Sequence, residues 1–251
     1  AISRAATLQQ EIVDAYNHFQ FHLIYQKLHN YCVVDMGGVY LDIIKDRQYT
    51  TSASSIARRS AQTALYHIVQ AFSRWIAPIL SFTADELYEF IPCQRGESVL
   101  LEELYSGVKP LLSKSSAEPE IMQHLVDVKF ATNKALEAAR ADGLIGSSLE
   151  AEVTVYAEPA LAEYLLAVGD ELRFVLITSA AKVVAGLEHA PGSAVATDLA
   201  GLKLVIESSA SEKCVRCWHH RPEVGSHAVH PQLCDRCIEN VDGDGEVRQY
   251  A

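Results

Sequence analysis

The sequence lacks the features that mark membrane and secreted proteins. No apolar run approaches the roughly 18 uninterrupted residues of a membrane span, and the longest apolar stretch, residues 174–187, is broken by Thr178, Ser179 and Lys182. No basic segment followed by an apolar one stands near the N-terminus, so we expect no secretion signal. Hydrophobic residues make up 49% and charged residues 21% of the chain, which excludes a disordered or collagen-like protein. We expect a soluble, cytoplasmic protein without a membrane partner.

Basic residues are also scarce. The chain has 21 Lys and Arg against 32 Asp and Glu, which gives a formal net charge of −11. Proteins that hold nucleic acid along much of their surface are usually basic, so this balance argues against general DNA or RNA binding. Residues 42–75 depart from it with five basic and two acidic side chains, whereas residues 82–150 hold six basic and twelve acidic ones. Contact with phosphate is therefore expected only in the first of these stretches.

The first ninety residues have a mainly helical pattern. Apolar residues recur at helical spacing over 8–30, 31–44 and 61–76, and Thr83–Glu86 has the pattern of a capping box that opens a short helix before Pro92. These segments predict an antiparallel helical bundle. The whole chain of 251 residues is long enough for one or two domains with a packed core.

Beyond the bundle the pattern changes. Residues 93–119 are rich in Gly, Ser, Pro and acidic side chains, which predicts a long surface excursion before the next helix. Helical spacing of apolar residues predicts helices over 120–141 and 161–168. Strands are expected over 151–156, where apolar residues alternate, and over 181–184 and 202–206. Residues 191–197 are expected to form a loop. This part of the chain is expected to form a small α+β unit.

Cysteine is rare, and its six copies are unevenly placed. Cys32 and Cys93 stand alone beside apolar residues, which predicts small buried side chains without chemistry. The other four form two Cys-x-x-Cys pairs with sixteen residues between them: Cys214, Cys217, Cys234 and Cys237. Each such turn can aim two thiolates at one metal ion, and two turns complete a tetrahedron. The four cysteines are therefore predicted to bind one Zn²⁺.

Two alternatives use the same part of the sequence. Disulfides between the pairs are disfavoured because nothing in the sequence indicates an oxidising compartment. A mixed cysteine and histidine site would draw on His219, His220, His227 or His230, but four well-spaced cysteines leave the histidines as outer or surface groups. Four protein ligands leave no position for an activated water, so we expect the zinc to be structural.

Residues 211–251 are too few and too polar to build a core of their own. Zinc is therefore expected to supply most of their folding free energy, on the order of 10 kcal/mol, and its removal to unfold this module alone. The residues interleaved with the ligands are Lys213, Arg216, Trp218, Arg221 and Arg236. An indole can stack on an unpaired base and Arg can bind phosphate. Equally, Trp218 can cover the zinc site while the charges are solvated.

Several segments carry a resemblance to a known family. They lie in the helical part (residues 40–49, 57–59 and 75–86), in the α+β part (145–152 and 171–176) and in the tail (214–218, 233–237 and 243–246). Together they resemble the C-terminal part of the bacterial isoleucyl-tRNA synthetases, which are class I aminoacyl-tRNA synthetases. The resemblance covers essentially the whole chain.

The resemblance implies three regions: a class I anticodon-binding helical domain over residues 1–145, a small α+β connective domain over 146–210, and a C-terminal zinc ribbon or knuckle over 211–251. It also implies that the ATP-binding catalytic fold and the editing domain lie outside this chain, which alone would not activate isoleucine. The implied function is recognition of the anticodon stem-loop of isoleucine tRNA by a monomer, in support of ATP-dependent attachment of isoleucine elsewhere in the parent enzyme.

By position in the family, the four paired cysteines would be zinc ligands and Trp218 the aromatic residue after the second of them. The candidate RNA contacts are Lys45, Arg47, Arg58, Arg59, Lys213, Arg216 and Trp218. Arginines of the helical part can instead pair with Asp42 or Asp46 on a solvated face.

The sequence is also compatible with a function of another class, a zinc-stabilised protein-interaction scaffold without RNA binding. A hydrolase is disfavoured because Ser and His residues show no recognisable catalytic spacing.

Overall fold

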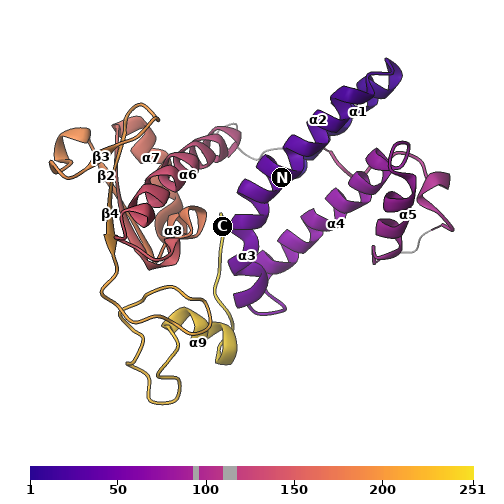
Figure 1. The fold of residues 1–251 in the computed structure, drawn as a ribbon. Coiled ribbons are helices and arrows are strands. Elements are labelled where there is room, and N and C mark those ends of the chain that lie inside the picture. The colour runs from indigo at the N-terminus through magenta and orange to yellow at the C-terminus, as the bar shows by residue number, and fades with distance from the viewer. Residues whose placement is uncertain (93–95, 110–117) are drawn as a thin grey trace. The chain divides into compact units, whose positions relative to one another are not determined.

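The computed structural model of the protein describes residues 1–92, 96–109 and 118–251. The chain divides into two compact units, Ala1–Asp42 with Arg58–Leu112 and Ile43–Ala57 with Ser113–Ala251. It is mostly helical and contains one small mixed sheet (Figure 1). Among the described residues, no helix combines the length and the apolar character needed to cross a membrane.

All the regular elements in the described part of the first unit are helices. Its elements, some of which extend past the boundary of the unit, are α1 (Ile2–Asn17), α2 (Phe21–Asn30), the π-helix η1 (Tyr31–Tyr40), α4 (Ile56–Ile76), α5 (Ser81–Glu89) and the short 3-10 helix η2 (Val99–Leu101). The fully buried Trp75 of α4 anchors the core, where its indole Nε1 donates to Gln9 Oε1 at 2.9 Å and its carbonyl accepts from the Tyr16 hydroxyl at 2.7 Å. Apolar faces of α1, α2 and α4 therefore pack around one aromatic side chain.

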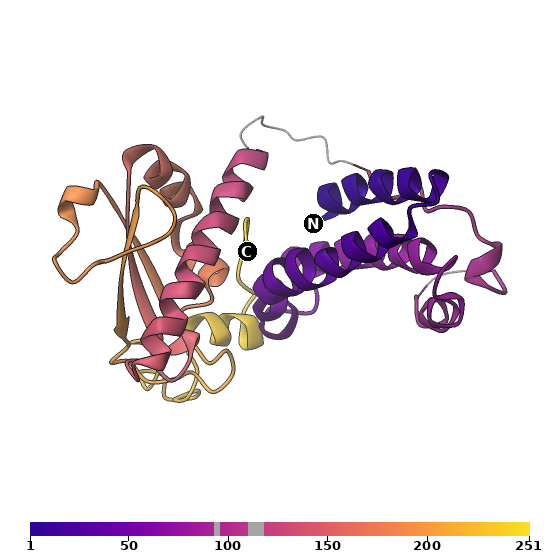
Figure 2. The same ribbon diagram turned by 45° about the horizontal axis from the view of Figure 1, so that its top comes forward.

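The predicted single helix over residues 8–30 is wrong at one point. The chain turns at residues 18–20, where Phe19 has a left-handed backbone with a φ of 54° and a side chain that is 79% exposed. As a result α1 and α2 form a hairpin (Figure 2), which Lys27 and Glu11 join at 2.7 Å. Phe19 continues the apolar spacing through the turn, so the periodicity contains no sign of the break.

Two further expectations need correction. Cys32 is exposed, because η1 turns it outward with its neighbours Val33 and Val34. The short helix α5 begins at Ser81 rather than after Thr83, and no side chain caps it, because its N-cap residue is Leu80, whose side chain has no hydrogen-bond acceptor.

The predicted surface excursion over residues 93–119 is confirmed over most of residues 96–109, where more than half of the residues are exposed and one short 3-10 helix forms, but two of its valines are anchored. Residues 93–95 and 110–117, and with them the predicted burial of Cys93, lie outside the described residues. In the described part, Val99 and Val108 are buried in the cores of the first unit. Arg74 of α4 pairs with Glu102 at 2.9 Å and so ties this segment to the helices.

The second unit is built on a four-stranded sheet of order β2-β1-β4-β3. Its strands are β1 (Ala151–Ala157), β2 (Ala180–Ala185), β3 (Val195–Ala196) and β4 (Leu202–Ser208). Strand β1 pairs parallel to β2, with Val153 opposite Ala181, and antiparallel to β4, with Val153 opposite Ile206. The strands predicted from alternation are confirmed, whereas the predicted loop over 191–197 contains the two-residue strand β3.

Helices α6 (Glu118–Ala141), α7 (Pro159–Val168) and α8 (Leu172–Leu176) cover one face of this sheet (Figure 1). Every second residue of β1 is buried, and these residues join Leu165 and Leu176 in the core. The same unit includes most of α3 (Leu41–Thr50), the helix α9 (Asp235–Asp242) and the loops that precede α9. Short 3-10 turns complete it: η3 (Ser148–Glu150), η4 (Gly169–Glu171) and η5 (Leu187–His189).

Candidate metal centre and its surroundings

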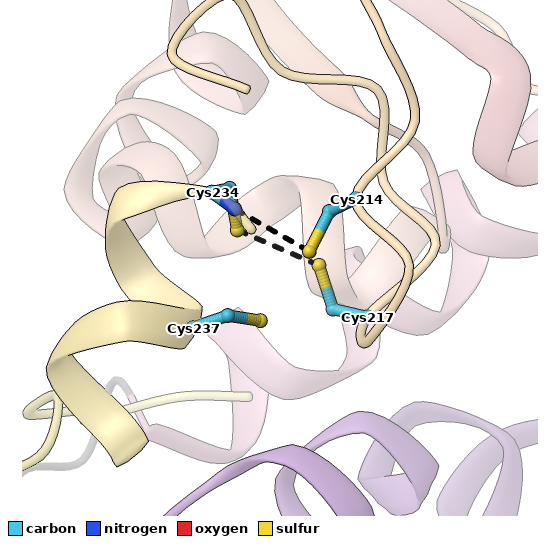
Figure 3. A group of neighbouring side chains, drawn as sticks. All are labelled: Cys214, Cys217, Cys234 and Cys237. Carbon is cyan, nitrogen blue, oxygen red and sulfur yellow. Dashed lines mark hydrogen bonds between the residues drawn. The ribbon is translucent and has the colours of Figure 1, made fainter. Parts of the chain in front are cut away.

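The four paired cysteines meet in one buried cluster (Figure 3). Cys214 and Cys217 come from a tight turn, in which the Trp218 amide donates to the Cys214 carbonyl at 2.9 Å. Cys234 is the N-cap residue of α9 and Cys237 lies in its first turn, so the helix start aims both sulfurs at the turn. A turn and a helix start thus supply two sulfur atoms each.

The sulfur geometry fits a tetrahedral zinc site. All four Sγ atoms lie within 4.8 Å of one another, and those of Cys217 and Cys234 are 3.7 Å apart. Zn–S bonds of about 2.3 Å would place tetrahedral sulfurs about 3.8 Å apart, whereas a disulfide requires about 2.0 Å. The donor set, its burial and the separation therefore fit a closed, structural Zn²⁺ site with four thiolate ligands.

Donors around the sulfurs suit the negative charge of four thiolates. The Cys234 amide donates to Cys214 Sγ at 3.4 Å, and Arg216 Nη1 lies 3.9 Å from Cys237 Sγ. Such donors stabilise thiolates, the form in which cysteine binds a metal.

The four histidines of this region do not belong to the sulfur cluster, whose described members are all cysteines. His219 is buried with its ring edge-on to Phe174, and the His220 amide donates to Ser179 Oγ at 2.6 Å. His227 contacts Asp235 and His230 contacts Asp242, both at 2.6 Å, which ties the loop before α9 to that helix.

Two predicted RNA contacts lie together on the surface beside the cluster. The Trp218 side chain is 59% exposed, and Lys213 Nζ lies 5.3 Å from the centre of its ring. Trp218 has a left-handed backbone with a φ of 68°, a conformation that costs a non-glycine residue about 1–2 kcal/mol. Arg216, also predicted to contact RNA, is half-buried and donates to the Thr50 carbonyl.

The remaining candidates lie on two helices. Lys45 is exposed and Arg47 half-buried on α3, whereas Arg58 is half-buried and Arg59 exposed in the first turns of α4. Only the α3 pair belongs to the same compact unit as the cysteine cluster.

The sequence analysis missed a buried ion-pair network next to the cysteines. Asp46 of α3 was considered as a partner for arginines of the helical part, but it pairs with Arg236 and Arg248, which lie 190 and 202 residues further along the chain. Glu246 accepts from the same two arginines at 3.0 Å each. No local pattern marks these residues, because the contacts join segments at opposite ends of the sequence.

Comparison with known proteins finds family matches for two regions of the chain. Residues 1–155 match the family described as the anticodon-binding domain of tRNA ligase, and residues 211–240 match a zinc finger found in FPG and IleRS. A helical region followed by a four-cysteine zinc finger therefore places the chain among proteins related to tRNA ligases. The chain belongs to the family of tRNA ligase anticodon-binding domains.

Its curated relatives include isoleucine–tRNA ligases. The chain is 57% identical to that of Marinomonas sp. (strain MWYL1) and 54% identical to that of Pseudomonas aeruginosa (strain UCBPP-PA14) over 251 residues, 100% of its length. It is 55% identical to the enzyme of Alcanivorax borkumensis over 250 residues. The chain spans only 26% to 27% of the length of these relatives.

Proposed function

We propose that this chain is the tRNA-recognition portion of an isoleucine–tRNA ligase and that it binds the anticodon stem-loop of isoleucine tRNA. The supporting observation is the match of residues 1–155 to the anticodon-binding family, joined to a four-cysteine centre that presents Trp218. In this proposal residues 1–145 form an antiparallel bundle of the class I type, residues 146–210 connect it, and residues 211–251 form a zinc ribbon.

The rest of the parent enzyme would supply the chemistry. Because the relatives are nearly four times as long as this chain, ATP-dependent attachment of isoleucine is assigned to segments outside it. The chain itself is non-catalytic, and its zinc is structural. We further propose that it acts in the cytoplasm as a monomer.

The proposed contacts combine stacking with charge. The exposed indole of Trp218 offers a face for an unpaired base, and Lys213 beside it can reach phosphate. Lys45 and Arg47 on α3, and Arg58 and Arg59 on α4, supply further positive charge. Arg216 also remains in the proposed set, with part of its guanidinium engaged by Thr50.

Binding of a synthetic anticodon stem-loop tests the proposal. With zinc-loaded protein, the dissociation constant is expected to rise as salt rises, by a log–log slope of about 0.7 for each single-stranded phosphate neutralised. A stem-loop with an altered anticodon should bind more weakly. Equal affinity for both RNAs, or no binding at low salt, would support the protein-interaction scaffold instead.

Substitution of Trp218 separates its role in RNA binding from its structural role. Both Trp218→Ala and Trp218→Gly remove the indole, so each should weaken RNA binding by about 1–3 kcal/mol if a base stacks there. Only the glycine variant relieves the left-handed backbone, so it should be more stable than the alanine variant by about 1 kcal/mol. RNA titrations and denaturant unfolding measure the two effects. Unchanged RNA affinity in both variants would show that the indole only covers the zinc centre.

A further inference from the structure

Each cysteine pair has an arginine immediately before its second cysteine, and the second of these, Arg236, is directed at α3. Its guanidinium donates to both carboxylate oxygens of Asp46, at 2.6 and 2.9 Å, and to the Thr50 hydroxyl at 3.2 Å. The side chains of Arg236 and Asp46 are only 10% and 16% exposed. Two parallel charge-assisted bonds of this kind fix orientation as well as distance.

Other contacts converge on the same end of α3. Arg248 makes a second ion pair with Asp46, and its guanidinium lies 3.6 Å from the centre of the Phe174 ring. The Ser52 amide donates to Asn240 Oδ1 at 3.3 Å, and Arg216 donates to the Thr50 carbonyl. Hydrogen bonding within a helix is incomplete at its end, so these side-chain contacts hold a segment that would otherwise fray.

The position of Arg236 depends on the metal centre. It lies between two proposed zinc ligands, Cys234 at the N-cap of α9 and Cys237 in its first turn. A metal ion that fixes these two sulfurs also fixes the backbone from which Arg236 reaches Asp46. Without the ion, the module keeps only Val224 and Leu233 packed against its cysteines, too small a core to hold the loop and helix start together.

We propose that Arg236 is a positioning residue through which the zinc centre holds residues 43–52, which are most of α3 and the two residues after it. The exposed Lys45 and Tyr49 of that segment are thereby presented in a fixed arrangement with Trp218. The consequence for RNA rests on the proposed function, whereas the link between zinc and α3 does not. Zinc thus organises an RNA-facing surface that extends beyond the residues between its ligands.

Hydrogen exchange of the amides of residues 46–52 tests this link directly. In zinc-loaded protein, Arg236→Gln is expected to speed their exchange about tenfold or more while one zinc per chain is retained. Arg236→Lys should give an intermediate rate, because it keeps the charge but loses the paired donors. Arg221→Gln is the matched control: Arg221 lies in the same module but bonds to Glu223 and Ser179, and its variant should match wild type.

Two further measurements complete the test. Chelation of zinc from the wild-type chain should speed exchange over residues 46–52 as Arg236→Gln does. If Arg236→Gln loses zinc, Asp46→Asn takes its place in the test. This variant removes the charge of the carboxylate on α3 that pairs with Arg236, and it changes no residue between the cysteines. Unchanged exchange in zinc-loaded Asp46→Asn, or after chelation of the wild type, would overturn the proposal. If wild-type protein binds no stem-loop while exchange behaves as expected, the proposed function fails but the positioning role stands.

Discussion

Removal of zinc is expected to unfold residues 211–242. The four-stranded sheet of the second unit and the helices of the first unit should stay folded. The apolar core of this module consists of the four cysteines with Val224 and Leu233 at its edge, whereas the sheet has its own core of β1, β4 and α6–α8. Metal binding of four thiolates contributes on the order of 10 kcal/mol at neutral pH, which exceeds what so small a core can supply. Residues 46–52, the end of α3 and the two residues after it, should loosen with the module, because Arg216 and Arg236 hold them.

Zinc content and hydrogen exchange after chelation measure this effect. Cys214→Ala is expected to lower zinc affinity by orders of magnitude and to reproduce the exchange pattern of the chelated wild type. Cys32→Ala provides the control, because Cys32 is exposed and lies outside the cluster, so zinc content should stay at one per chain. Full protection of residues 211–242 in metal-free protein would show that the module folds without its ion.

The cysteine cluster was predictable because its chemistry is local. Two residues between thiolates in each pair are enough to make a two-sulfur turn, whatever the rest of the chain does. The structure brings the two pairs together with Cys217 and Cys234 at a separation suited to zinc. Strand β1 was predictable for a similar reason, since apolar residues that alternate over several positions are typical of a strand with one buried face.

The missed features depend on contacts rather than on local pattern. The apolar spacing continues through the turn at Phe19, so the sequence alone suggests one helix. The break is invisible in the sequence because the apolar residues of α1 and α2 are buried in the same core. Cys32 has apolar neighbours in the sequence, but the face of η1 that carries them is turned outward. In both cases the tertiary arrangement decides which apolar residues are covered.

The network around Asp46 was the least predictable feature of the site. Charges on a helix are expected to face solvent, yet Asp46 meets arginines 190 and 202 residues away and becomes buried with them. The RNA contacts stay predictions, since exposed basic and aromatic residues are compatible with more than one partner. In the structure, Trp218 and Lys213 lie beside each other.

Asp46→Asn is expected to lower the free energy of unfolding by about 3–5 kcal/mol, the usual cost of removing one partner from a buried ion pair. The substitution leaves Arg236 and Arg248 with a neutral amide in place of the carboxylate, and the Arg248 side chain is only 1% exposed. Denaturant unfolding of the zinc-loaded protein measures the loss. Asp198→Asn is the matched control, because Asp198 pairs with Lys134 at a site where its side chain is 78% exposed. Such a surface pair contributes at most about 1 kcal/mol.

The pH dependence of stability provides an independent check on the same carboxylate. Burial alone would raise the pKa of Asp46, but Arg236 and Arg248 outweigh it and lower the pKa from 3.8 to about 2. A group whose pKa is lower in the folded than in the unfolded state stabilises the fold above its unfolded pKa and loses that contribution as the pH falls toward its folded pKa. Wild-type stability should therefore decrease by roughly 2 kcal/mol from this group as the pH falls from about 4 to about 2. The Asp46→Asn variant has no carboxylate to protonate, so its free energy of unfolding should change less over this interval. Parallel pH profiles for the two proteins would show that the arginines do not hold Asp46 in its charged form.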